Sequence, residues 1–284
     1  LKIASKYKIG IISYICDDYY FIKQPKRLLE RIRSYFVRRK IRETLGKSQA
    51  IVTICEELRQ IYSDYFKKQT IMLMTGSNYE IATEIKSKKE INSITYMGNL
   101  SCHRDESIYD VGMALEQINK TSEKKHYLDI YANLNSELKR KFEGINSIRL
   151  HDFVSGSEFR RIFLNAELFL HVEDFSEESI DRVKHSVSTK IADILASGIP
   201  LLAYGPDNIA SMNHLKNNKC AICVNHKKDL KNMLEWVFRE QKIRDAVAGR
   251  GLMAARQYHN SYHDSKKLYK FIEYTCNKTI TRQG

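Results

Sequence analysis

The chain has 284 residues, of which 43% are hydrophobic and only 3 are proline, a composition that excludes a disordered protein and suits two modest domains. Lys and Arg number 47 against 34 Asp and Glu, so the formal net charge is +13, which favours an anionic partner. The apolar run from Ile191 to Tyr204 contains Asp193 and Pro200 and is shorter than the roughly 20 residues that cross a bilayer. The sequence therefore predicts no transmembrane helix.

Cysteine use and the first residues bear on the compartment. The 6 cysteines are scattered, which does not suit a disulfide framework and favours a reducing, cytosolic location. Cys220 and Cys223 form a Cys-x-x-Cys pair in an apolar run without a second pair at zinc spacing, so we interpret them as buried strand residues. The chain starts Leu1-Lys2-Ile3 with no basic stretch followed by an apolar one, and we expect no signal peptide.

Three short apolar or β-branched runs alternate with helical patterns in the first third of the chain. They cover residues 9–15, 49–54 and 70–76, and a polar, Lys-rich linker, 80–92, follows. Alternation of this kind is typical of βαβ units in a parallel sheet. Three strands make an incomplete Rossmann-like domain, which we place at residues 1–92.

The segment from Leu28 to Leu45 predicts a basic helix within this domain. Its apolar residues recur at helical spacing and arginines surround them. Such a helix suits an anionic membrane surface. The alternative is a surface helix whose apolar stripe faces the core of the protein.

Six further strand candidates follow the linker. They cover residues 93–98, 126–132, 147–153, 166–172, 199–205 and 220–224. Six strands alternating with helices make a complete Rossmann-like sheet. We therefore predict an α/β protein with two parallel-sheet domains, 1–92 and 93–284, the second ending in a helix.

Residues 185–205 carry the strongest functional signal. Ser188 and Thr189 can cap the start of a helix that runs to about Ala196, Gly198 can end it in the left-handed conformation, and Pro200 forbids its continuation. The free N–H groups of the first turn, the two hydroxyls and the ammonium of Lys190 would converge at the carboxyl edge of the sheet. That combination predicts a diphosphate site.

Asp193 lies three residues after Lys190, on the same face of this helix. A carboxylate there can accept two hydrogen bonds from the vicinal hydroxyls of a ribose. The alternative is an ordinary ion pair between Lys190 and Asp193 on the helix surface.

At this point the sequence resembles a known family. The segment STKIADILASGIP resembles the phosphate-and-ribose element of GT-B glycosyltransferases of the retaining, family 4-like group, which includes lipopolysaccharide and capsule enzymes. SITYMGNLSCHRDESI resembles the first strand and loop of their nucleotide-binding domain. There the resemblance implies diphosphate roles for Gly98 and Arg104.

Two other stretches resemble the same family in the same order. IRLHDFVSGSEFRRIFLNAELFLHV resembles its base-contacting region, which implies that His151, Asp152, Phe153 and Val154 meet the base. SQAIVTICEELRQIYSDYF and TIMLMTGSN resemble the end of its acceptor domain. Two glutamates of the family, with seven residues between them, correspond here to His185 and Asp193. The resemblance implies a GT-B fold and a metal-independent glycosyltransferase.

Candidate catalytic groups are Asp17 and Asp18, after the first strand, and His185. A carboxylate there can orient the donor sugar or take the acceptor proton, although aspartates at a strand end also commonly bond their own backbone. The acidic loop residues Glu173, Asp174, Glu177 and Glu178 are further candidates for donor hydroxyls. The chain contains no Asp-x-Asp, which argues against a metal-dependent GT-A enzyme. We expect no cofactor and no metal ligands.

The sequence thus predicts transfer of a sugar from a nucleoside-diphosphate donor to a glycan or lipid-linked acceptor in cell-surface polysaccharide biosynthesis. The expected location is cytoplasmic, as a peripheral protein at the inner membrane face. One alternative is a degenerate transferase that only binds sugar nucleotides. The other is a nucleic-acid-binding protein, which the charge permits; against it, acidic residues are interleaved with the basic ones and no nucleic-acid-binding motif is present.

Overall fold

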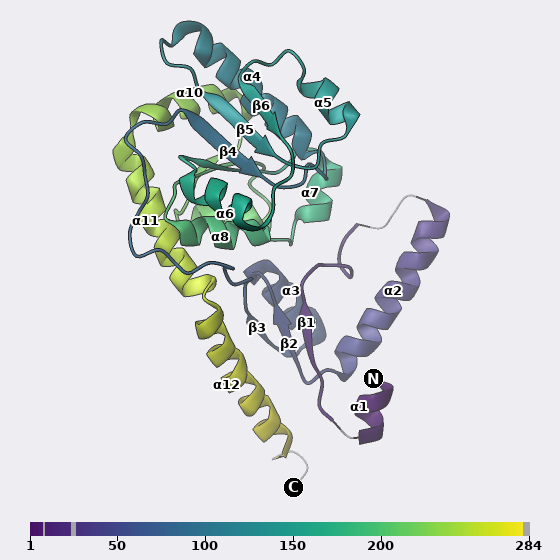
Figure 1. Ribbon diagram of the computed structural model, residues 1–284. Helices are drawn as coiled ribbons and strands as arrows, with labels where there is room; N and C mark the ends of the chain where they lie inside the picture. Colours follow the sequence, from purple (N-terminus) through teal and green to yellow (C-terminus); the bar gives the residue numbers. More distant parts are fainter. Residues whose placement is uncertain (8, 24–26, 281–284) are drawn as a thin grey trace.

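The computed structural model describes the backbone of residues 1–7, 9–23 and 27–280, with side chains up to residue 277, and it forms two α/β lobes (Figure 1). Every strand pair in these residues is parallel. The nine predicted strands are all present, each shorter than its apolar run. The α/β class with two parallel sheets is therefore confirmed.

The first lobe is built on a three-stranded sheet of order β1-β2-β3. Its elements are α1 (Lys2–Tyr7), β1 (Ile12–Ile15), α2 (Leu28–Lys47), β2 (Ala50–Thr53), α3 (Glu56–Phe66) and β3 (Gln69–Met72). The central strand β2 is buried along its whole length, which explains its uninterrupted run of Ala, Ile, Val and Thr. Leu58 and Tyr62 of α3 pack on one face of this sheet.

The second lobe holds a six-stranded sheet of order β6-β5-β4-β7-β8-β9, the strand order of a Rossmann fold. Its strands are β4 (Ser93–Met97), β5 (Tyr127–Tyr131), β6 (Ile148–His151), β7 (Phe169–Val172), β8 (Leu201–Tyr204) and β9 (Ile222–Val224). Its helices are α4 (Arg104–Thr121), α5 (Ser136–Phe142), α6 (Gly156–Asn165), α7 (Glu177–Val183), α8 (Thr189–Ser197), α9 (Ala210–Asn217), α10 (Lys227–Arg239) and α11 (Gln241–Tyr258).

Helices cover both faces of this second sheet. Alternate residues of β8 enter different cores: Leu202 packs with α4 and α10, whereas Leu201 packs with α6, α8, α9 and α11. This alternation follows from the period of two in a strand. The N-terminus of α8 lies at the carboxyl edge of this sheet, since Ser188 lines one cavity with Gly98, which follows β4, and Glu173, which follows β7.

The connection between the lobes is pinned to the second lobe along residues 77–86. Ala82 N donates to Ala196 O (2.8 Å) and Lys86 N donates to Gly198 O (2.7 Å). Gly198 ends α8 with φ 75°, as predicted, and a Cβ there would lie 2.6 Å from Glu84 O. Glycine at this position therefore lets the connection pass close to α8.

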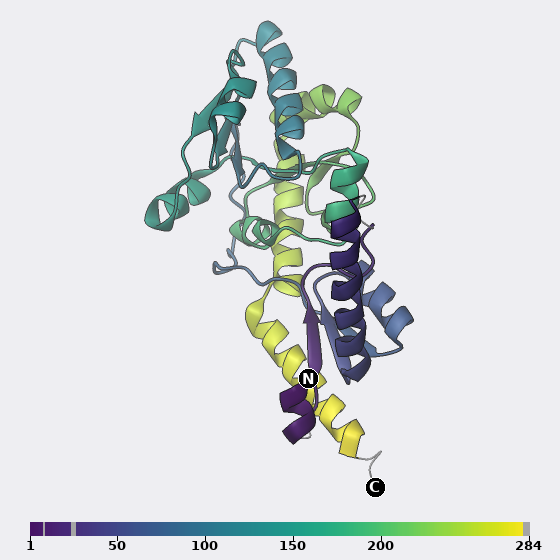
Figure 2. The same cartoon turned by 90° about the vertical axis from the view of Figure 1, so that its right-hand side faces the viewer.

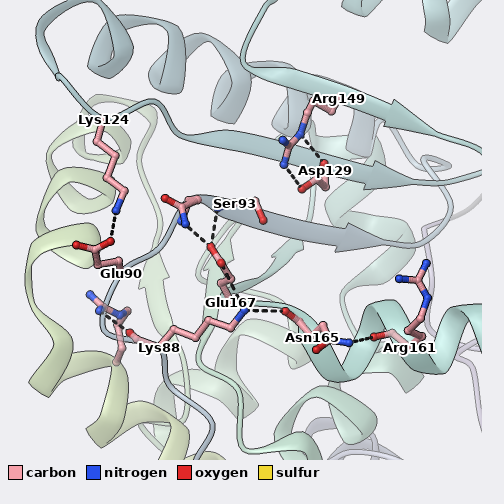
Figure 3. A network of polar contacts seen from close by, with 11 residues as sticks. Lys88, Glu90, Ser93, Lys124, Asp129, Arg149, Arg161, Asn165 and Glu167 are labelled. Carbon is pink, nitrogen blue, oxygen red and sulfur yellow. Dashed lines mark hydrogen bonds and ion pairs between the residues drawn. The ribbon is translucent and has the colours of Figure 1, made fainter.

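A network of polar contacts holds the end of the connection against the second sheet (Figure 3). Glu167 accepts hydrogen bonds from the backbone N–H groups of Asn92 (2.5 Å) and Ser93 (2.9 Å) and lies 3.4 Å from the ammonium of Lys88. The fully buried Arg244 of α11 donates to the carbonyls of Lys88 and Lys89. These contacts fix where β4 begins.

The last helix, α12 (Ser261–Ile280), returns to the first lobe, and Figures 1 and 2 show it running on from α11 down the length of that lobe. Phe271 and Leu268 pack against Ala50 and Val52, and Lys267 Nζ donates to Met72 O (2.9 Å). The division of the chain at residue 92 stays a prediction. The first lobe contains the last helix as well as the residues before the connection.

The basic helix α2 is largely unpartnered and stands at the right of Figure 1. Its apolar side chains contact the core only near its end, where Leu45 is buried and Ile41 is partly buried. Those nearer its start are exposed: Leu28, Leu29, Ile32, Tyr35, Phe36 and Val37.

Candidate donor-binding site

The site is built on the N-terminus of α8, which begins within one residue of the predicted position. Ser188 is the N-cap residue, but its hydroxyl makes no capping hydrogen bond. The first turn of a helix carries backbone N–H groups without intrahelical partners and the positive end of the helix dipole. The hydroxyl and these N–H groups are therefore available to an anion.

A cavity of about 230 Å³ opens at this helix start. The five residues predicted to bind the diphosphate all line it: Gly98, Arg104, Ser188, Thr189 and Lys190. Gly98 follows β4, Arg104 opens α4, and the other three open α8. His171 and Glu173 complete the wall on the side of β7.

Lys190 lines this cavity as a cation that is not paired with a carboxylate of the described residues. Among the residues that the structure describes, its ammonium has no hydrogen-bond or ion-pair partner. Burial, followed by the nearby charge of Arg104, lowers its pKa, and Asp193 opposes this effect. An anionic ligand beside Lys190 would offset both the cost of burying its charge and the repulsion by Arg104.

Arg104 is paired with a carboxylate. Its guanidinium donates from Nε and Nη2 to the two carboxylate oxygens of Glu173, both at 2.9 Å, and from Nη1 to Asn99 Oδ1 at 3.1 Å. Burial alone would lower the pKa of Arg104, but Glu173 outweighs it and the pKa is raised. Arg104 is therefore charged and committed to Glu173 in the unliganded protein.

A second cavity of about 180 Å³ adjoins the first and shares Met97, Gly98, Asn99 and Lys190 with it. Its remaining walls are mostly apolar and aromatic: Tyr131, Asn133, Phe153, Val154 and Phe159. A mostly apolar and aromatic space beside an anion site suits a nucleobase and its ribose. Two of the four residues predicted to meet the base, Phe153 and Val154, lie here.

The other two predicted base residues lie outside this cavity. His151 stacks on Tyr131, with ring centroids 4.4 Å apart, and its Nε2 lies 2.7 Å from Asp129 Oδ1. Asp129 is also held by Arg149 (Figure 3). Asp152 lines a wider surface hollow with Phe153. The structure thus brings Phe153 and Val154 to the donor cavities but not His151 or Asp152.

Asp193 lies outside both cavities. Its carboxylate accepts hydrogen bonds from Asn78 N (2.7 Å), Asn78 Nδ2 (3.1 Å) and Ser77 Oγ (3.1 Å), all from the connection between the lobes. No ion pair joins it to Lys190 within the described residues. Asp193 thus ties α8 to the connection, and its predicted contact with ribose would require these hydrogen bonds to be exchanged.

Two of the three predicted catalytic residues meet at the junction of the lobes. Asp18 Oδ2 lies 2.8 Å from His185 Nδ1, although 167 residues separate them in the chain. Asp18 Oδ1 accepts from Tyr62 Oη (3.0 Å) and from the backbone N–H groups of Tyr20 and Phe21. Burial would raise the pKa of Asp18, but these hydrogen bonds, with that from His185 foremost, outweigh it and lower the pKa.

An ionised Asp18 assigns the proton of His185 to Nδ1 and leaves Nε2 as a hydrogen-bond acceptor. The neighbouring residues Ser186 and Val187 line the 230 Å³ cavity, and Val187 also packs against the core of the first lobe. The pair therefore lies beside the donor cavity. Asp17, by contrast, is exposed and makes no hydrogen bond or ion pair in the described part of the chain.

Sequence reasoning missed two residues at the site, Tyr62 and His171. It also missed the pairing of Glu173 with Arg104. Their sequence signal is weak, because a tyrosine on an amphipathic helix and a histidine within a strand both resemble ordinary core residues. Glu173 was one of four acidic candidates in its loop.

The described residues contain neither a cluster of metal ligands nor a membrane-spanning helix. Within residues 1–7, 9–23 and 27–280, no three His, Cys, Asp or Glu side chains gather closely enough to hold a metal ion. Cys220 is buried and Cys223 partly buried; burial raises their pKa values to about 12 and about 11. In the same residues, no helix is long and apolar enough to cross a membrane.

No protein-family model matches the chain, and no curated protein matches it in sequence. Solved structures do. WaaG, a glycosyltransferase involved in lipopolysaccharide biosynthesis, aligns with a TM-score of 0.62 and 12% identity over 90% of this chain and 73% of its own. An α,α-trehalose 6-phosphate synthase from Burkholderia multivorans aligns with a TM-score of 0.68 and 11% identity over 99% and 69%. Anabaena Alr3699/HepE, solved with UDP and glucose, gives 0.66 and 10% over 95% and 73%.

The chain has a GT-B fold. It spans about seven tenths of the length of these three proteins. The partial GT-B fold predicted from the sequence is thereby confirmed, since the first lobe holds three strands and the second a complete Rossmann sheet. At identities of 9 to 12%, the likeness concerns the fold alone, and the activity must be argued from the site.

Proposed function

We propose that this GT-B protein is a glycosyltransferase that takes a sugar from a nucleoside-diphosphate donor and passes it to a glycan or lipid-linked acceptor. One observation carries the proposal. Five residues chosen from the sequence as diphosphate ligands, on three separate segments, line one cavity at the carboxyl edge of the Rossmann sheet. An apolar and aromatic cavity adjoins it on the side where a base would extend.

Transfer requires the diphosphate to leave the anomeric carbon with an added negative charge. The N-terminus of α8 supplies roughly half a positive charge, and Lys190 supplies a full one beside it. Both are fixed before the reaction and lie in a partly buried cavity, where they stabilise developing charge more strongly than water does. The chain's own residues thus provide the electrostatic part of catalysis.

The acceptor hydroxyl must lose its proton as the new glycosidic bond forms. His185 is the group in the proposed site whose free Nε2 can accept it, because Asp18 holds the Nδ1 proton. Asp18 acts through His185 and is a positioning residue. Asp18 belongs to the first lobe and His185 to the second, so the pair is complete only when the lobes are together.

A thermal-shift assay tests donor binding. UDP, GDP and their sugar conjugates are each added to the protein, and a specific ligand at about 100 times its dissociation constant adds about 2.7 kcal/mol to stability. We expect a saturable rise in melting temperature with one of the two bases, and its loss in Lys190→Met. If neither base gives a shift, the proposal is wrong. Binding without sugar transfer would instead identify a sugar-nucleotide-binding protein without turnover.

The exposed start of α2 supports a membrane-bound acceptor. Leu29 and Phe36 are 81% and 61% exposed, and basic residues flank them: Arg27, Arg31, Arg33, Arg38, Arg39, Lys40 and Arg42. Exposed apolar groups among arginines suit the surface of an anionic bilayer, where each basic residue contributes about 1 kcal/mol. Such a surface would place the enzyme on the cytoplasmic face of the inner membrane, beside lipid-linked acceptors.

Vesicle sedimentation tests this surface. We expect the protein to bind vesicles that contain phosphatidylglycerol and not vesicles of phosphatidylcholine alone. Replacing both Leu29 and Phe36 by Ser should weaken binding, whereas Met253→Ser, an equally apolar and exposed position on α11, should not. Equal binding by both variants would rule α2 out as the docking surface.

A further inference from the structure

The donor cavity contains a carboxylate that a diphosphate would meet as a like charge. Glu173 is 3% exposed and holds both arms of the Arg104 guanidinium. Its backbone is fixed as well, because Ser107 Oγ donates to its carbonyl (2.9 Å) and its N–H donates to Tyr204 O (3.0 Å). The backbone of Glu173 is therefore held at the wall of the cavity.

His171 lies beside this ion pair and lacks a hydrogen-bond partner at Nε2. The ring is buried in the wall of the cavity, and Nε2 is 3.6 Å from Glu173 Oε1, slightly too far for a hydrogen bond. Burial, with the charges of Arg104 and Lys190, lowers the pKa of His171, and Glu173 opposes them. These are the charged groups that face His171, and they keep it neutral in the unliganded protein.

Charge balance shows what a diphosphate would do here. The unliganded cavity holds two cations, Arg104 and Lys190, and one anion, Glu173. The diphosphate of a sugar nucleotide brings two negative charges, so the formal charges of these side chains and the ligand would sum to −1. A buried charge without a partner is strongly unfavourable, and titratable neighbours change protonation to avoid it. Protonation of His171 would restore neutrality.

We propose that binding of a nucleoside-diphosphate sugar moves Arg104 from Glu173 to the phosphate oxygens, while His171 takes a proton from solvent and pairs with Glu173. This inference rests on the proposed function and adds two positioning residues to it. One proton moves from solvent to His171 Nε2 and forms an N–H bond there, and the freed carboxylate of Glu173 accepts a hydrogen bond from it. Glu173 and His171 thereby favour a ligand that carries two negative charges at this point.

Isothermal titration calorimetry in two buffers of different ionisation enthalpy tests the proposal, because the difference in heat counts the protons taken up. UDP-glucose and GDP-mannose are suitable probes, since their phosphates do not titrate near neutral pH. At pH 7 we expect uptake of about half to one proton per ligand bound by the wild type. Uridine, which lacks phosphate, should give no uptake.

Two variants and a control assign the proton. His171→Gln and Glu173→Gln should both bind the sugar nucleotide without proton uptake. His171→Gln removes the imidazole that accepts the proton, and Glu173→Gln removes the negative charge that stabilises the protonated imidazole. Glu143→Gln removes an exposed carboxylate of the same lobe that lines neither cavity, and it should behave as the wild type. If His171→Gln does not fold, the wild-type imidazole can be titrated by NMR, where the ligand should raise its pKa by more than about one unit.

The outcomes separate the two claims. Saturable, Lys190-dependent binding with no proton uptake, or with uptake that persists in His171→Gln, overturns the inference and leaves the proposed function standing. Absence of binding by both sugar nucleotides overturns the proposed function, and the inference with it.

Discussion

Replacing Asp18 by Asn changes one atom of the pair that joins the lobes. The amide oxygen of the Asp18→Asn variant can still accept from Tyr62 and from the backbone N–H groups of Tyr20 and Phe21. The new amide nitrogen would face His185 Nδ1 as a donor, so His185 would have to carry its proton on Nε2. The shape of the site is kept, but the free nitrogen of His185 becomes a donor and cannot take a proton.

The size of the effect follows from these roles. A positioned general base contributes about 100- to 10,000-fold to a rate, and Asp18→Asn should lower turnover by that range. Donor binding should stay unchanged, because Asp18 lies outside the diphosphate cavity. Weaker hydrogen bonds to a neutral amide should cost about 1 to 3 kcal/mol of folding stability. Because the pKa of Asp18 is lowered in the folded protein, this stability difference is complete above about pH 4 and is lost as the pH falls further.

Turnover of radiolabelled sugar nucleotide and calorimetric donor affinity, measured on the same preparation, separate these effects. Asp64→Asn is the matched control, since Asp64 is an exposed aspartate on the helix that carries Tyr62. A variant that transfers sugar at the wild-type rate would refute the assignment of His185 as the base. A parallel loss of turnover and donor affinity would show that Asp18 maintains the fold of the site instead of the protonation of His185.

Three further predictions concern single residues. Asp193→Ala removes the acceptor for Ser77 and Asn78 and should lower the free energy of unfolding in urea by about 2 to 4 kcal/mol; unchanged stability would contradict its role in tying α8 to the connection. Burial and His259 lower the pKa of His214 to about 3, so stability should fall by up to about 1.4 kcal/mol per unit as the pH drops from about 6.5 towards 3. His214→Gln should reduce this loss of stability at low pH, and a variant with the pH dependence of the wild type would contradict the assignment to His214. Lys190→Met should leave the unfolding free energy within about 1 kcal/mol of the wild type, since it removes no internal bond; a larger loss would show a structural role.

The fold was predictable because each strand is a short apolar run between helical patterns. The six-stranded sheet follows from six such runs, and Gly198 and Pro200 located the end of α8. The strand ends were less predictable. The run at 9–15 forms a strand only from Ile12, because pairing with β2 begins there. The return of α12 to the first lobe depends on contacts such as that of Phe271 with Val52, which no local pattern contains.

The site shows the same division between local and distant interactions. The helix start at residues 188–190 was predictable, because a helix start is a local feature with its own sequence pattern. Asp193 was expected to bind the ribose because it lies on the same helix face as Lys190. Its hydrogen-bond partners Ser77 and Asn78 lie more than 100 residues away in the chain, so no local pattern reveals them. The pairs Asp18–His185 and Arg104–Glu173 are likewise formed only by the tertiary structure.

A crystal structure of the protein with UDP would locate the diphosphate. We expect the two phosphates at the start of α8, within hydrogen-bond distance of Lys190 Nζ and of the backbone N–H groups of the first turn. The uracil should extend towards Phe153 and Val154. Diphosphate bound elsewhere, or Lys190 directed away from it, would refute a donor site at the start of α8.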